Sequence, residues 1–306
     1  MPPWTRLIRF VAAEDHQIYT GQPLDDSLDI GQAYSSGQPI KARLLSAPSL
    51  LDDPLHATLS DQVRTVKALL PPLDPQRVGT IRALGANFVQ PGQNEVEAKK
   101  NRPPIPILFY KPATALGGPE GEIVVPLVAR EGGVDQADYE VELGVVLSRP
   151  TKDITASEAS AHILAYTLTN DVSFRKRMFA VPQWGLGKSF DGSLPIGPVL
   201  VHPSLIPNPE DVRLKTEVNG KTVQEGSTSQ HLWKVFETVA QLSQGTTLPA
   251  GTLISMGTPP GEGFKQNPPR WLKHGDLVVV SGDKGLGSLR NWVREEGVQT
   301  AVKAKL

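Results

Sequence analysis

The sequence contains no cysteine. Without thiols the chain cannot form a disulfide, a thiolate nucleophile, a cysteine zinc site or an iron–sulfur cluster. It also lacks an excess of either charge, since 31 Lys and Arg stand against 32 Asp and Glu, a formal net charge of −1. Nucleic acids and anionic membranes bind through a basic field, so we expect neither as a partner.

Long apolar segments are missing as well. No stretch approaches the ~18 apolar residues of a membrane-spanning helix. The first residues, MPPWTRLIRFVAAEDHQ, carry two arginines and two acids among short apolar runs, which is not the pattern of a signal peptide. We therefore expect a cytoplasmic protein. A chain of 306 residues with 39% hydrophobic content can still bury a sizeable core.

Glycine and proline number 28 each and are scattered along the chain between short strand-like segments. This punctuation favours a β-rich α+β fold over a doubly wound α/β fold. The segment LLPPLDPQ (69–76) has three prolines and no periodicity, so we place a boundary there. We expect a small N-terminal β domain over residues 1–75 and a main domain over 76–306.

Several local patterns predict particular elements. RLIRFVA and HQIYTG read as two opening strands, and Asn219-Gly220 predicts the turn of a hairpin. Residues 59–70 fit a helix or a strand equally well. Thr155 and Glu158 have capping-box spacing ahead of a helix of about ten residues, and apolar residues at helical spacing over 232–242 predict a second helix. The polar tract 90–104 reads as a lid loop.

The stretch DYEVE (138–142) carries three acids at alternate positions. On a strand these side chains share a face and repel one another, unless positive charge lies between them. One interpretation is an exposed edge kept soluble by charge. The other is a site for Mg²⁺ or Mn²⁺, which prefer carboxylate oxygens, with Asp171 of YTLTNDVSFRKR as a further ligand.

Six segments together resemble the fumarylacetoacetate hydrolase superfamily. They are DYEVELGVV, YTLTNDVSFR, WGLGKSFDGSLPIGP, VNGKTVQEGSTSQHLW, SMGTPPGEGF and GLGSLRN, which follow the family order from about residue 79 to 291. SMGTPPGEGF is similar to the family pattern T-G-T-P-x-G-(V/T)-G. The resemblance implies a mixed β-roll like that family's C-terminal domain, binding one divalent cation (Mg²⁺ or Mn²⁺, with Ca²⁺ possible in crystals).

The resemblance also implies roles for individual residues. Glu140, Glu142 and Asp171 would hold the cation, and Lys188 would place positive charge near substrate oxygens. Thr258 would contact a substrate carboxylate, and Asp138 would orient a ligand or a water. The remaining substrate-binding positions implied by the matched motifs are Gly257, Arg175, Asn87 and Phe88. The implied partner is a small oxo or enol acid, bound by a homodimer with one complete site in each protomer.

One segment departs from the family. Its hydrolases carry G-x-N-Y-x-x-H-x-x-E, whose His and Glu activate water, whereas LGANFVQPGQNEVE has Pro91 and Asn94 at those positions. Proline cannot transfer a proton. The sequence therefore favours decarboxylation, isomerisation or tautomerisation, or (de)hydration through a metal-stabilised enolate. The alternatives are a C–C bond hydrolase with its base relocated to Glu95, Glu97 or His231, and a non-catalytic, metal-stabilised binding protein.

Overall fold

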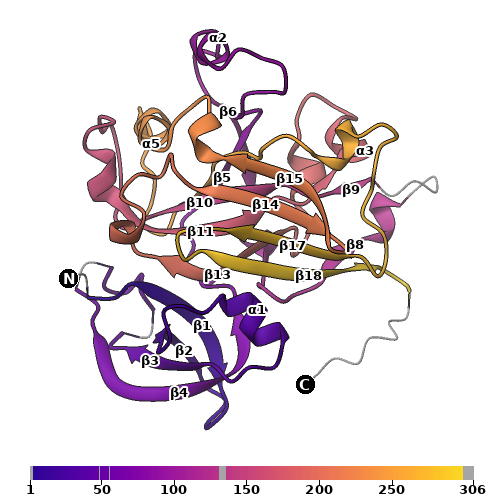
Figure 1. Cartoon of the computed structure of the whole chain (residues 1–306). Coiled ribbons are helices and arrows are strands. Elements are labelled where there is room, and N and C mark those ends of the chain that lie inside the picture. The colour runs from indigo at the N-terminus through magenta and orange to yellow at the C-terminus, as the bar shows by residue number, and fades with distance from the viewer. Residues whose placement is uncertain (1–2, 48, 55, 131–135, 299–306) are drawn as a thin grey trace.

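The computed structural model describes residues 3–47, 49–54, 56–130 and 136–298, and this part of the chain is β-rich, as predicted (Figure 1). A group of strands at the bottom of the view comes from the N-terminal segment. Its elements are β1 (Arg6–Ala12), β2 (Ile18–Pro23), α1 (Ile30–Ser35), β3 (Lys41–Leu45) and β4 (Leu59–Leu70). The ambiguous residues 59–70 therefore form a strand, which pairs with both β1 and β3.

The central sheet runs in the order β2-β3-β4-β1-β13-β11-β10-β16-β5-β6. Strand β1 pairs with β13, with Leu7 opposite Leu200, so the N-terminal strands continue the sheet of the main body. Its further strands are β5 (Ile81–Gly85), β6 (Ile107–Lys111), β7 (Leu116–Gly117), β10 (Val141–Leu147), β11 (Ile163–Asn170), β13 (Leu194–Val201) and β16 (Leu253–Ser255).

A second sheet runs in the order β15-β14-β17-β18-β8. Its strands are β8 (Ile123–Val125), β14 (Arg213–Val218), β15 (Lys221–Ser227), β17 (Leu277–Gly282) and β18 (Gly287–Glu295). The predicted hairpin is confirmed, because β14 and β15 are joined by Asn219 and Gly220 with φ angles of 52° and 76°. Both angles lie in the left-handed region that this turn requires.

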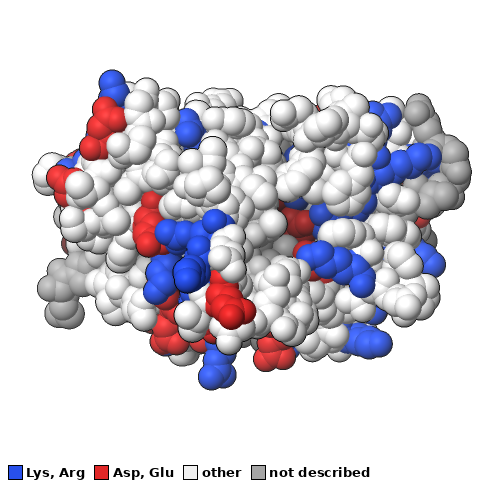
Figure 2. All heavy atoms as spheres, turned by 90° about the horizontal axis from the view of Figure 1, so that it is seen from above, with Lys and Arg blue, Asp and Glu red and all other residues white. Residues whose placement is uncertain are grey.

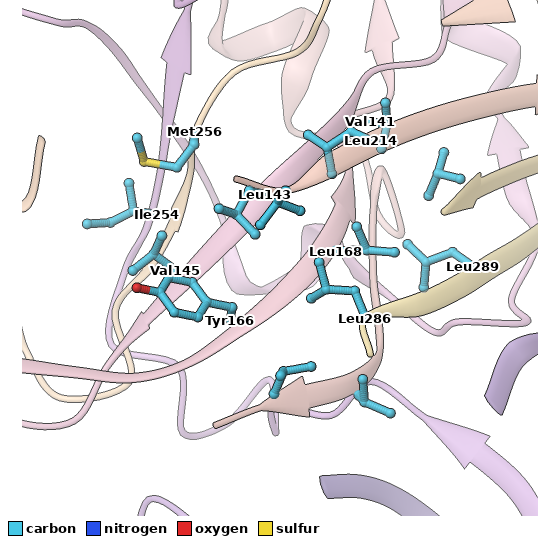
Figure 3. Packing of buried hydrophobic residues seen from close by; sticks show 14 of the residues in the cluster. Val141, Leu143, Val145, Tyr166, Leu168, Leu214, Ile254, Met256, Leu286 and Leu289 are labelled. Carbon is cyan, nitrogen blue, oxygen red and sulfur yellow. The ribbon is translucent and has the colours of Figure 1, made fainter. Parts of the chain in front are cut away.

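The two sheets pack face to face over the largest hydrophobic core. Figure 3 shows Val141, Leu143 and Val145 of β10 beside Leu168 of β11 and Leu214 of β14, all buried. Because side chains alternate along a strand, Glu142 points to the opposite side of β10 from these three residues. The core thus fixes the strand that carries the acids.

Helices are short in the described residues. They are α2 (Glu95–Lys100), α3 (Arg175–Met178), α4 (Gly185–Lys188), α5 (Val235–Ser243) and the 3-10 turns η1 (Ala113–Ala115), η2 (Leu127–Ala129), η3 (Ala159–His162), η4 (Pro203–Leu205), η5 (Thr228–Gln230) and η6 (Gly263–Lys265). A further pair of two-residue strands, β9 (Ala137–Asp138) and β12 (Ser173–Phe174), joins the site region. Within the described ranges, no helix has the length and apolar content to cross a membrane.

Two local predictions need correction. The helix expected after Thr155 is only the turn η3, although Thr155 and Glu158 do form the predicted hydrogen bond of 2.8 Å. Strand β11 takes the next residues, since ILAYTLTN is buried throughout and pairs on both edges. The tract 90–104 contains helix α2, because the Asn94 side chain caps it by accepting from Glu97 N at 3.1 Å. The helix predicted over 232–242 is confirmed as α5.

Candidate active site and metal centre

Three carboxylates converge where β10 and β11 lie side by side. Ligand oxygens of Glu140, Glu142 and Asp171 all lie within 4.8 Å of one another, and the three residues are at most 7% exposed. Two hydrogen bonds hold the ends of the strands together. Asp171 N donates to the backbone oxygen of Glu140 at 2.8 Å, and Glu140 N donates to the side-chain oxygen Asn170 Oδ1 at 3.0 Å. The interpretation of DYEVE as an exposed edge is therefore wrong.

Three buried cations separate these acids. Lys188, at the end of α4, donates to Glu140 Oε2 at 2.7 Å and to Asp171 Oδ2 at 2.8 Å. Lys111 of β6 donates to Asp171 Oδ1 at 2.6 Å. Arg175 bridges Asp138 and Glu140 through Nε and Nη2. Four carboxylates thus face three cations, so the fully ionised cluster keeps one net negative charge.

Glu142 carries the least compensated of these charges. Its Oε2 accepts from Ser255 Oγ and from Gly257 N, both at 2.6 Å, and neither donor is charged. Burial raises the pKa of Glu142 well above its ordinary value, and Asp171 and Glu140 raise it further. Three converging carboxylates with excess negative charge are a donor set that fits a hard divalent cation.

Lys111 and Lys188 stabilise the charged form of the buried Asp171. Burial alone would raise the pKa of Asp171, but Lys111 and Lys188 together hold it below its ordinary value. Burial lowers the pKa of Lys111, and for Lys188 the fields of Asp171 and Glu140 outweigh burial and raise the pKa. Asp171 and Lys188 are thus both charged at neutral pH, and each stabilises the other.

Asp138 lies outside the triad. Its two oxygens accept from the backbone N–H groups of Tyr139, Gly263 and Phe264 and from Arg175 Nε. With four donors its carboxylate is fully engaged. Asp138 therefore acts on the triad through Arg175, whose other arm contacts Glu140, and it does not line the cavity described next.

A cavity of about 280 Å³ opens over the triad. Figure 2 shows acidic atoms at the bottom of a hollow flanked by basic side chains on this face of the molecule. Its charged and polar lining includes Glu140, Glu142, Arg175, Lys188, Thr258, Glu262, Lys265 and Gln90. The rest of its wall is mainly apolar and includes Leu84, Phe109, Met178, Phe179, Trp184 and Phe264. A small polar floor under an aromatic wall is typical of a small-molecule site.

Thr258 is presented to this cavity as a donor. Its Oγ1 accepts from Gln224 Nε2 at 2.8 Å, which leaves the hydroxyl hydrogen for another acceptor. Gln224 is held in that orientation because its Oε1 accepts from Thr216 Oγ1 and Val141 N. Gly257 precedes Thr258 with φ of +89°, and a Cβ there would lie 2.8 Å from Asn87 Cβ. Glycine at 257 therefore lets the backbone N–H reach Glu142.

Other predicted site residues lie elsewhere. Glu95 on α2 is half exposed and pairs with Lys99, so the structure does not bring it to the cavity. Phe88 is buried against the ring of His231 and does not line the cavity either. Asn87 is buried too, and its amide bonds the backbone of Trp233 and Met256. Asn87 is thus bonded to the segment that leads to Thr258, and neither Asn87 nor Phe88 lines the cavity in this structure. Their role as substrate contacts stays a prediction.

We expect Asn87→Ala to lower stability without changing substrate affinity. The substitution leaves the Trp233 N–H and two buried carbonyls without their partner, at a cost of about 1–3 kcal/mol for each such group. Thermal unfolding should show a clearly lower midpoint, while KM measured well below that midpoint stays at the wild-type value. A raised KM with an unchanged midpoint would instead make Asn87 a substrate contact.

The other two alternative bases, His231 and Glu97, do not line the cavity either. Both ring nitrogens of His231 lack a hydrogen-bond partner, and burial lowers its pKa to about 3, so this imidazole is neutral and enclosed by protein. Its Nδ1 lies 4.0 Å from Glu210 Oε2. Glu97 is exposed on α2 and lines a separate surface depression. Neither residue reaches the acids of the triad in this structure.

Sequence reasoning missed Lys111, Ser255, Gln224 and Glu262. Lys111 had a visible signal, because a buried lysine at the end of the largely apolar strand ILFYK needs a buried partner. Glu262 also had one, since it occupies the Val or Thr position of the family pattern quoted above. Ser255 and Gln224 look like ordinary strand residues, and only the pairing of distant strands brings them to Glu142 and Thr258.

Comparisons with known proteins agree with this architecture. The model of the fumarylacetoacetate (FAA) hydrolase C-terminal family matches residues 80–294. A caffeoylpyruvate hydrolase of Neonothopanus nambi is 40% identical over 294 residues, which are 96% of this chain and 94% of that protein. A human mitochondrial oxaloacetate tautomerase is 37% identical over 231 residues, covering 73% and 72%.

Solved structures show the same fold. The crystal structure of a 2-hydroxyhepta-2,4-diene-1,7-dioate isomerase from Mycobacterium marinum superposes with a TM-score of 0.76 at 28% identity, covering 96% of this chain and all of the other. A fumarylacetoacetate hydrolase from Exiguobacterium antarcticum gives 0.76 at 29% identity, covering 95% and 100%. The similarity thus extends over the N-terminal strands as well as the main body.

Proposed function

Because the chain belongs to the fumarylacetoacetate hydrolase family, whose members similar to it are enzymes acting on small oxo acids, we propose that it is a metal-dependent tautomerase of a 2-oxo acid. One observation carries the proposal. The carboxylate triad and Lys188 lie under the cavity, while the positions of the family's water-activating His and Glu hold Pro91 and Asn94.

The residues at the floor suit enolate chemistry. A divalent cation held by Glu140, Glu142 and Asp171 would polarise the keto and carboxylate oxygens of a 2-oxo acid and so acidify its C3–H bond. Lys188 donates to Glu140 and Asp171 and lines the cavity, so its ammonium can neutralise charge that develops on the keto oxygen. The Thr258 hydroxyl can donate to the substrate carboxylate.

The finer assignments are part of the same proposal. Mg²⁺ or Mn²⁺ is the expected ion, because the proposed ligands are all carboxylate oxygens. A homodimer is the expected assembly, as implied by the family resemblance. The absence of cysteine supports the cytoplasm as its location.

The test follows keto–enol exchange directly. Oxaloacetate and an aromatic 2-oxo acid such as phenylpyruvate are mixed with Mg²⁺-loaded protein in D₂O, and deuterium entry at C3 is followed by NMR. We expect exchange well above the protein-free rate for at least one of the two, and the protein-free rate after EDTA treatment. An exchange rate that stays unchanged after EDTA treatment would contradict a metal-dependent reaction.

A C–C bond hydrolase is the second candidate, favoured by the 40% identity to a caffeoylpyruvate hydrolase over nearly the whole chain. The aromatic wall of the cavity, with Phe109, Phe179, Trp184 and Phe264, would also accommodate an aromatic acylpyruvate. The same sample in H₂¹⁸O separates the two reactions. Hydrolysis yields pyruvate and an aromatic acid with ¹⁸O in its new carboxylate, whereas a tautomerase leaves the carbon chain intact.

A further inference from the structure

Tautomerisation needs a group that takes a proton, and the cavity offers few. Of its described lining residues, three are carboxylates and three are cations. Glu140 and Glu142 belong to the triad, and Arg175 and Lys188 are bonded to it. The remaining titratable residues of the lining are Glu262 and Lys265.

These two residues form an ion pair on the cavity wall. Lys265 Nζ lies 2.8 Å from Glu262 Oε1, and Glu262 Oε2 accepts from Gly261 N at 3.1 Å. Glu262 is only 6% exposed, whereas the Lys265 side chain is 40% exposed. The carboxylate is therefore the inner member of the pair, with solvent on the side of the lysine.

The pair also lies next to the segment that departs from the family. Lys265 Nζ donates to Gln90 Oε1 at 2.8 Å, and Gln90 directly precedes Pro91, which replaces the family's histidine. Glu262 itself stands where the family pattern has Val or Thr. The chain thus lacks the family's acid–base pair in this segment, and the Glu262–Lys265 pair contacts the same segment through Gln90.

We propose that Glu262 is the catalytic base of the enolisation, with Lys265 as its positioning residue. This inference rests on the proposed tautomerase function. The Glu262 carboxylate takes the proton from C3 as the C3–H bond breaks. The released electron pair forms the C2=C3 bond, and the carbonyl π electrons move onto the keto oxygen, beside Lys188. Glu262 then returns the proton to that oxygen, which gives the enol and restores the carboxylate.

The experiment compares three variants in the C3 deuterium-exchange assay with Mg²⁺. Glu262→Gln keeps the shape of the side chain and should lower kcat by about 10²–10⁴-fold, the usual contribution of a general base, with KM unchanged. Glu262→Ala should lose as much and regain rate when formate is added, since formate can supply a carboxylate. Glu122→Gln is the matched control, because Glu122 is an exposed acid paired with Arg294, and it should keep the wild-type rate.

The outcomes separate failure of the tautomerase function from failure of Glu262 as its base. If the wild type shows no exchange with either oxo acid, the tautomerase function fails and the base fails with it. If the wild type exchanges and Glu262→Gln keeps more than about a third of its rate, only the assignment of Glu262 is overturned. Loss of rate that formate does not restore in Glu262→Ala, or that comes with weaker Mg²⁺ binding by calorimetry in Glu262→Gln, also overturns it.

Discussion

Glu142→Gln is expected to abolish exchange activity and, at the same time, to leave the protein at least as stable as the wild type when EDTA is present. Activity is lost because one of three converging carboxylates no longer carries charge for the cation. Stability is kept because the glutamine carbonyl can still accept from Ser255 Oγ and Gly257 N.

The sign of the stability effect follows from the pKa. Burial, and then Asp171 and Glu140, raise the pKa of Glu142 in the folded protein above its ordinary value of 4.5. A carboxyl with a raised folded-state pKa binds its proton more tightly in the folded chain than in the unfolded chain. Its contribution to stability therefore falls as pH rises above 4.5 towards the folded-state pKa. The glutamine removes this unfavourable contribution at neutral pH.

Thermal unfolding with and without Mg²⁺ measures the stability of the metal-free protein and the stability that it gains from the cation. For the wild type, a cation at 100 times its Kd adds about 2.7 kcal/mol of stability. Glu142→Gln should lose most of this gain, while Glu225→Gln, which alters an exposed acid of β15, should keep it. A Glu142→Gln protein with the full Mg²⁺ shift would remove Glu142 from the ligand set.

Lys188→Met should lower stability, unlike Glu142→Gln, and like that variant it should lower the exchange rate. The ammonium lies 2.7 Å from Glu140 Oε2 and 2.8 Å from Asp171 Oδ2, and it is 2% exposed. Removing one member of a buried ion pair leaves uncompensated charge at a cost of about 3–5 kcal/mol. The rate should fall by about 10²–10³-fold, as for loss of a donor to a developing oxyanion.

A divalent cation should restore part of this lost stability, because it supplies positive charge to the same two carboxylates. The Mg²⁺-induced rise in the unfolding midpoint should therefore be larger in Lys188→Met than in the wild type. Lys215→Met is the control, since Lys215 pairs with Glu217 at the surface, where an ion pair is worth about 0–1 kcal/mol. A smaller Mg²⁺ shift in Lys188→Met would mean that lysine and cation do not share these acids.

The elements that could be predicted from the sequence are those whose signals are local. The Asn219-Gly220 hairpin and helix α5 depend on turn chemistry and on apolar spacing, both of which are visible in a short window. The helix expected over 156–165 failed because a capping box marks a start and says nothing about length. Burial of β11 between two strands decided that the chain continues as a strand.

The residues of the candidate site also differ in how far the sequence predicts them. Glu140, Glu142 and Asp171 could be predicted to lie together because they belong to matched family motifs, and the structure brings their carboxylates together. Lys111 and Glu262 stand out in the sequence, but their contacts could not be predicted, because each depends on which distant strand or loop packs beside it. For Asn87 and Phe88, a motif match does not say whether the residue faces the cavity, and in this structure both are buried outside its lining.

The loop of residues 257–264 is tied to the acids by its own backbone. Gly257 N donates to Glu142, while Gly263 N and Phe264 N donate to Asp138, which holds Arg175 against Glu140. The same loop presents Thr258 and Glu262 to the cavity. We therefore expect a cation bound at Glu142 or Glu140 to influence the position of this loop, and a ligand that moves the loop to influence the acids in return. Thermodynamic linkage requires this coupling to be reciprocal, so the factor by which the cation changes substrate affinity should equal the factor by which the substrate changes cation affinity.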